Sequence, residues 1–167
     1  MNNCNWNHDL KKGYSFLRNK KYEDYKNINH RYENAYKYLN SAYNKLLKCD
    51  PKNNLRLAEI SLYKGISLNE NLDIKNEIYR NNKAIDEYNK GMNHLKKLKI
   101  DENQLLMSLN NSLGVAYHHK DFSHIPDISY KYYNEAYKIY NENMKKKKFK
   151  NIMKKVEYNS GYKYKLK

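Results

Sequence analysis

The sequence is poor in the residues that interrupt or cross-link a chain. It contains two Pro, five Gly and two Cys among 167 residues. Because Pro and Gly are the residues that most often end a helix, their scarcity leaves long segments free to be helical. Cys4 and Cys49 are too few and too far apart in the sequence for a disulfide framework or a zinc site. We therefore expect free thiols and a reducing compartment.

Long apolar runs and targeting patterns are missing as well. No stretch approaches the ~20 apolar residues that a membrane-spanning helix needs. Residues 1–10 contain no apolar run and no Arg-rich transit pattern, and Asn2 stands where N-myristoylation requires Gly. These absences predict a cytoplasmic protein with no transmembrane segment, and they leave a nuclear location open.

The chain also lacks the patterns of known catalytic and cofactor sites. It has no Gly-rich phosphate loop, no nucleophilic Ser elbow and no paired carboxylates in a recognisable frame. His118, His119 and His124 cluster, but no acid or Cys completes a metal-binding set. Cys49 has no neighbouring His that would activate its thiol. We expect neither an enzyme nor a metal or cofactor site.

Acidic residues are outnumbered. The 33 Lys and Arg exceed the 18 Asp and Glu and give a formal net charge of +15, which is typical of proteins that bind nucleic acid, an anionic membrane or an acidic protein. Only four of these residues are Arg, whose planar fork suits phosphates and bases. Asn, Lys and Tyr, which dominate the composition, have A/T-rich codons. We therefore favour an A/T-rich genome as the explanation and keep selection for a polyanion as the alternative.

Two short motifs recur three times in the same order. The first is Gly-x-x-(large apolar) and the second is small-x3-large-x2-small. The glycines recur 52 and 49 residues apart, and the second motif recurs 49 and 45 residues apart. The two motifs begin, in the three copies, at Gly13 and Ala35, Gly65 and Ala84, and Gly114 and Ser129. The chain therefore contains three copies of one unit of about 50 residues.

Apolar residues recur every three or four positions, the spacing that keeps one face of a helix apolar. In each unit the pattern predicts a short helix with the Gly motif, followed by a longer helix. The predicted short helices cover 7–20, 55–69 and 102–119, and the long ones cover 22–47, 74–98 and 130–144. Pro51 can open the second short helix, and Asp101 with Gln104 forms a capping box for the third.

The small residues of the second motif lie seven positions apart, two turns along one helix face. There they would let a neighbouring helix approach closely, with Leu39, Tyr88 and Tyr133 filling the space between them. Gly114 is expected to act in the same way on the third short helix.

The third unit carries a family resemblance. Leu113-Gly114-x2-Tyr117 followed by Tyr130-x2-Tyr133-x2-Ala136 resembles a tetratricopeptide repeat, whose consensus has Leu-Gly-x2-Tyr in the first helix and Ala-x3-Phe in the second. The units depart from the family in their length, since its period is about 34 residues, and in the absence of its consensus Trp. The resemblance implies an all-α fold, a right-handed α-α superhelix of three antiparallel helix pairs with lengthened helices.

The predicted domain covers 1–158, with repeats at 7–50, 51–100 and 101–144. A basic helix at 145–158 would cap the open end of the stack, because solenoid ends need a polar-faced terminal element, and 159–167 would form a basic tail. The alternative is that this helix binds nucleic acid or an anionic membrane surface. The residues that would do so are Lys145, Lys146, Lys147, Lys148, Lys150, Lys154 and Lys155.

The resemblance also implies that the short helices line a concave groove, which would suit an amphipathic helix or an extended peptide. The implied function is a protein-interaction scaffold or adaptor, or a subunit that docks in a larger assembly. The expected groove residues are Asn7, Leu10, Tyr14, Leu17, Arg18, Leu62, Ile66, Asn69, Asn111, Val115, His118 and His119. Each Leu and Tyr of this set is equally expected in the core.

A subset of the family binds the C-terminal carboxylate of chaperones through Lys, Arg and Asn in the groove. Here Leu10, Tyr14 and Ser112 occupy those places, so the sequence does not predict a chaperone-tail receptor. The identity of the protein or peptide partner stays open.

Overall fold

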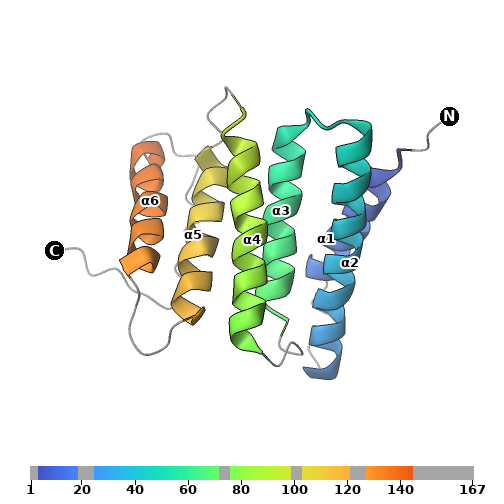
Figure 1. Cartoon of the computed structure of the whole chain (residues 1–167), viewed down its shortest axis with the longest axis horizontal. Helices are drawn as coiled ribbons and strands as arrows, with labels where there is room; N and C mark the ends of the chain where they lie inside the picture. The colour runs from blue at the N-terminus through green and yellow to red at the C-terminus, as the bar shows by residue number, and fades with distance from the viewer. Residues whose placement is uncertain (1–3, 19–24, 72–75, 99–102, 121–126, 145–167) are drawn as a thin grey trace.

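The structure, a computed structural model, describes residues 4–18, 25–71, 76–98, 103–120 and 127–144. These residues form six α-helices and no strand, so the predicted all-α class is confirmed for them (Figure 1). The helices are α1 (Trp6–Arg18), α2 (Tyr25–Cys49), α3 (Asn54–Asn69), α4 (Glu77–Leu95), α5 (Asn103–Lys120) and α6 (Asp127–Met144).

The helix positions agree with the apolar spacing to within a few residues. Among the described residues, α5 and α6 have 18 residues each, so a short helix followed by a longer one is not seen in the third unit. The residues after Met144 lie outside the described ranges. Pro51 does not open α3. It lies in the turn before the helix, and Asn53 caps α3 by accepting a hydrogen bond from the Arg56 amide. Asp101 of the predicted capping box lies outside the described residues.

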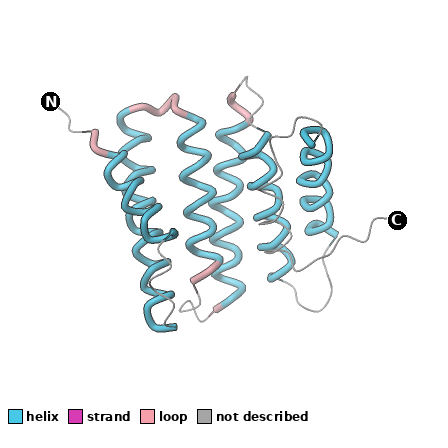
Figure 2. The backbone as a smooth tube through the Cα atoms, turned by 180° about the vertical axis from the view of Figure 1, so that it is seen from behind, coloured by secondary structure: helices cyan, strands magenta, loops and turns pink. Residues whose placement is uncertain are grey.

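Each helix packs against its neighbours in the chain, and α3 also contacts α5. The helices therefore form a row that runs from α1 and α2 at one end to α6 at the other, and the view from behind shows the same row (Figures 1 and 2). We call α1 with α2, α3 with α4, and α5 with α6 the first, second and third pairs.

The glycine of each unit meets the large residue of the second motif in the same unit. A Cβ atom added at Gly13 would lie 2.7 Å from Cγ of Leu39, and one at Gly114 would lie 2.6 Å from Cδ1 of Tyr133. At Gly65 the distance to Cε1 of Tyr88 would be only 2.2 Å. Only glycine therefore leaves room for these side chains, and the two motifs interlock in the same way in all three pairs.

The apolar core lies in three clusters along the row. The first joins α1, α2 and α3 around Leu39, the second joins α3, α4 and α5 around Tyr88, and the third joins α5 and α6 around Met107. All six small residues of the second motif are buried: Ala35, Ala42, Ala84, Gly91, Ser129 and Ala136.

The exposed side of α6 is mostly polar and includes Lys131, Asn134, Glu135 and Lys138, but Ile128 and Tyr130 are exposed as well. This helix therefore presents both charged and apolar side chains to solvent at the end of the row. The predicted capping helix at 145–158, the predicted tail at 159–167 and the seven Lys residues proposed to bind polyanions lie outside the described residues.

The two cysteines are not free thiols. Cys4 and Cys49 form a disulfide, with their Cα atoms 6.1 Å apart. The prediction was wrong because it judged distance along the sequence, whereas the packing of α1 on α2 brings the start of one helix to the end of the other. Nearby, the buried Asp9 carboxylate accepts hydrogen bonds from Ser41 (2.6 Å) and Lys45 (2.7 Å) on α2.

The disulfide removes the basis for expecting a reducing compartment, because such bonds persist in oxidising ones. Within the described ranges, none of the helices is long and apolar enough to cross a membrane.

Candidate functional site: the seam between α3 and α5

Two pockets of about 310 Å³ each lie along the seam where α3 faces α5. The first pocket lies toward the amino-terminal ends of both helices and the second toward their carboxyl-terminal ends, where Tyr88 of α4 joins the lining. The first pocket is lined by Leu55, Arg56, Glu59, Leu62, Tyr63, Gln104, Leu105 and Ser108. The second pocket is lined by Ile66, Asn69, Glu70, Tyr88, Asn111, Ser112, Val115 and His119.

Half of the predicted groove residues line these pockets. The first pocket contains Leu62, and the second contains the other five, namely Ile66, Asn69, Asn111, Val115 and His119. His118 is half-buried beside His119, with 5.7 Å between the ring centroids, and lines neither pocket.

The predicted residues on α1 line neither pocket. Leu10 is buried in the first core cluster, and Leu17 packs partly buried against that cluster. Tyr14 packs edge-on against Tyr63, with ring centroids 4.7 Å apart, and the exposed Arg18 guanidinium lies over the Tyr14 ring. Leu10 is therefore an ordinary core residue, which was the alternative interpretation of this position. Asn7 is exposed at the start of α1.

Four of the lining residues that the sequence did not predict belong to the stripe that it did predict. On α3, Leu55 and Glu59 precede Leu62 at the spacing of one helix face, and on α5 Gln104 and Ser108 precede Asn111 in the same way. Extending each stripe back to the first turn of its helix would have found them. Arg56 and Tyr63 flank the α3 stripe and carry no comparable signal.

The first pocket offers apolar and polar surface to a ligand in similar amounts. Leu55, Leu62, Tyr63 and Leu105 contribute the apolar part, and Leu55 is exposed although it is a large apolar residue. The two charged residues of the pocket pair with each other, since Arg56 donates to the Glu59 carboxylate. With those charges satisfied internally, the apolar part of the pocket can take an apolar side chain.

The second pocket is more polar and contains amide groups without partners. Asn111 is only 7% exposed, and no described residue hydrogen-bonds its Oδ1 atom. The Oδ1 atom of Asn69 is buried and equally unpaired among the described residues. Tyr88 is buried beside them, and burial raises the pKa of its hydroxyl above the ordinary value. Burial, together with His118, lowers the pKa of His119, which favours its neutral form.

Charges of both signs lie at this end of the seam. Glu70 lines the second pocket, and the Arg80 and Arg31 cations are close enough to act on its carboxylate. Arg80 itself is paired with Glu77 at 3.1 Å. Since neither sign dominates, the pocket has no electrostatic preference for a charged ligand.

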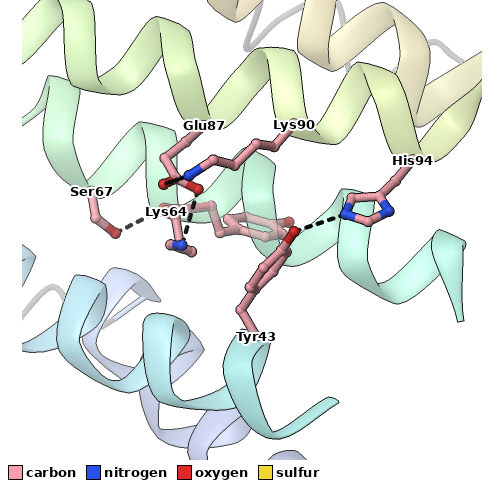
Figure 3. Close-up of polar contacts among 7 residues, drawn as sticks. Tyr43, Lys64, Ser67, Glu87, Lys90 and His94 are labelled. Atoms are coloured by element: carbon pink, nitrogen blue, oxygen red, sulfur yellow. Dashed lines mark hydrogen bonds and ion pairs between the residues drawn. The ribbon is translucent and has the colours of Figure 1, made fainter. Parts of the chain in front are cut away.

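A second group of polar side chains lies between α2, α3 and α4; Lys64, Glu87 and His94 are buried there, whereas the Lys90 side chain is half exposed (Figure 3). Lys64 and Glu87 form an ion pair of 3.0 Å and are 3% and 6% exposed, respectively, at their side chains. Lys90 donates to the other carboxylate oxygen of Glu87 at 2.8 Å. The Lys64 ammonium also lies over the rings of Tyr43 and Tyr36, at 4.6 and 5.6 Å from the centroids. Burial lowers the pKa of Lys64, against the opposing effect of Glu87.

The same interface contains a hydrogen-bonded chain of three side chains. The Tyr43 hydroxyl lies 2.8 Å from Nε2 of His94, and Nδ1 of His94 lies 3.1 Å from Oδ1 of Asn54. Since the amide oxygen can only accept, Nδ1 donates and Nε2 accepts from Tyr43. Burial, assisted by Lys97, lowers the pKa of His94 and favours this neutral form. Through Tyr36 and Tyr43, both polar groups connect α2 to the second pair.

No group of three or more His, Cys, Asp or Glu side chains that could hold a metal ion occurs in the part of the chain that the structure describes. His124 of the predicted histidine cluster lies outside that part.

No protein-family model, curated protein or solved structure matches this chain.

Proposed function

We propose that this protein is an interaction scaffold or adaptor that binds a peptide segment of a partner protein along the seam between α3 and α5. The observation that carries the proposal is the second pocket, in which the buried Asn111 lacks a hydrogen-bond partner among the described residues. Buried polar groups are nearly always satisfied, so an unpaired amide that lines an open pocket favours a ligand that completes it.

The proposed framework is a tetratricopeptide-like, right-handed superhelix of three antiparallel pairs within a single domain. The identical contact of Gly13, Gly65 and Gly114 with the large residue of the same unit supports three copies of one structural element. Repeat proteins of this kind use the surface along their stacked first helices for binding, which agrees with two pockets on α3 and α5. The proposal includes no catalytic step and no cofactor.

The test is selection from a displayed library of random twelve-residue peptides against the folded protein. Ser112→Trp fills the second pocket from a half-buried position on α5, and Asn134→Trp adds the same side chain to the exposed face of α6. Peptides that bind the native protein and Asn134→Trp but not Ser112→Trp support the proposal. Since the net charge of +15 attracts acidic peptides without specificity, the selection is run at physiological salt and repeated at higher salt.

The proposal fails if no enriched peptide distinguishes the two tryptophan variants. Circular dichroism of both variants ensures that lost binding reflects a blocked pocket rather than an unfolded protein.

A further inference from the structure

The two asparagines of the second pocket define what can bind there. Asn111 and Asn69 each have a buried Oδ1 atom without a hydrogen-bond partner among the described residues, and both line the same cavity. A carboxamide also carries two N–H donors, so it binds best to a group that both donates and accepts. Another carboxamide side chain can donate to the asparagine oxygen and accept from the asparagine N–H in one contact.

We propose that the second pocket binds an uncharged amide side chain, Asn or Gln, of a peptide whose apolar side chain fills the first pocket. This inference rests on the proposed function and names its ligand. A carboxylate can only accept, so it would leave the asparagine oxygens without donors. An ammonium group can only donate, so it could not accept from the asparagine amides.

The two pockets also set the spacing of the ligand groups. On both α3 and α5, the residues of the second pocket follow those of the first by about nine positions, and at a rise of 1.5 Å per residue this corresponds to roughly 13 Å. An extended chain advances about 3.3 Å per residue and places every second side chain on the same face, so four residues cover this distance. The ligand therefore has an apolar residue and an Asn or Gln four positions apart.

A helical ligand does not fit this spacing. Covering roughly 13 Å takes about nine helical residues, and side chains nine positions apart on a helix point in opposite directions. The geometry therefore favours an extended segment, in either chain direction.

The experiment uses the peptides enriched in the selection described above, synthesised with a fluorescent label and measured by anisotropy. We expect the groove-dependent peptides to share an apolar residue and an Asn or Gln with three residues between them. Replacing the peptide's amide residue with Glu, Lys or Leu should weaken binding about tenfold, as should inserting one residue between the two anchors. The Asn111→Leu variant should bind a peptide with Gln at the amide position and the same peptide with Leu there with equal affinity.

Two further variants keep the test decisive. Asn69→Leu should also reduce the preference for an amide residue in the peptide, and because Asn69 lies on α3 this variant leaves α5 unchanged. Leu105→Asn should weaken all peptides alike, because it alters only the first pocket. The inference is overturned if groove-dependent peptides lack an amide residue, prefer a charged one, or space their anchors as on a helix. In those cases the proposed function survives, whereas the absence of any groove-dependent peptide overturns both.

Discussion

The ion pair between Lys64 of α3 and Glu87 of α4 allows a quantitative test of how two charges are tolerated where the second pair faces α2. Both side chains are almost fully buried, at 3% and 6% exposed. Removing one member leaves the other charged and buried, which typically costs about 3–5 kcal/mol. In Lys64→Met, Glu87 keeps its hydrogen bond from Lys90, so we expect a loss near 3 kcal/mol. In Glu87→Met, the contacts that remain to the Lys64 ammonium within the described residues are the faces of two tyrosine rings, and we expect a loss near 5 kcal/mol.

The double variant should behave differently. Because burial lowers the pKa of Lys64 despite the adjacent carboxylate, the cost of desolvation outweighs the attraction. Replacing both charges with methionine, which fills space flexibly, should therefore be neutral or stabilise the fold by up to about 4 kcal/mol. The free energy of unfolding is measured in urea, and each single variant should lower the melting temperature by roughly 6 to 20 °C.

The chain offers a matched control at Lys12, which immediately precedes Gly13 as Lys64 precedes Gly65. Lys12 is exposed and lies 5.2 Å from the centroid of the Tyr38 ring, so Lys12→Met should change stability by less than about 1 kcal/mol. A double variant as unstable as Glu87→Met would refute the reasoning, because the ion pair would then contribute more than its burial costs.

Three further predictions concern stability. Replacing Cys49 with Ser opens a covalent loop with a sequence separation of 45, and the chain-entropy relation predicts that the free energy of unfolding falls by about 4 kcal/mol. A urea midpoint that does not respond to the substitution or to reductant would contradict the disulfide. Gly65→Ala should cost about 1–3 kcal/mol because its methyl group overlaps the Tyr88 ring, and a higher melting temperature would show that the contact is loose. His94 has a lowered pKa in the folded state, so the unfolded chain binds the proton first; its contribution is complete above the ordinary value of 6.5 and declines as the pH falls below it. Urea midpoints between about pH 7.5 and 5 should therefore fall less steeply in His94→Gln than in the native protein.

The helices were predictable because their apolar spacing is local and regular. The partner of each glycine was not, since placing Tyr88 over Gly65 requires knowing how two helices dock. The disulfide escaped prediction for the same reason: Cys4 and Cys49 become neighbours only when α1 lies along α2.

The groove was predictable in part. On α3 and α5 the expected stripe lines two pockets, but on α1 the corresponding Leu10 packs into the core against α2. The buried Lys64 and Glu87 could have been noticed by comparing the units. The matching positions hold Lys12 and Tyr38 in the first unit, and Leu113 and Tyr132 in the third. That comparison reveals an exception, but only the packed structure shows that the two charges meet.

The position of the disulfide has a consequence for the way the molecule opens. Both cysteines belong to the first pair, so the cross-link closes that pair on itself and fastens it to nothing else. Attachment of the first pair to the rest depends on noncovalent contacts. These are the apolar cluster that α1 and α2 share with α3, the hydrogen bond between Tyr43 and His94, and the Tyr36 and Tyr43 rings that face the Lys64 ammonium. Amide hydrogen exchange should therefore report α1 and α2 as one covalently closed unit, which separates from α3 with its disulfide intact.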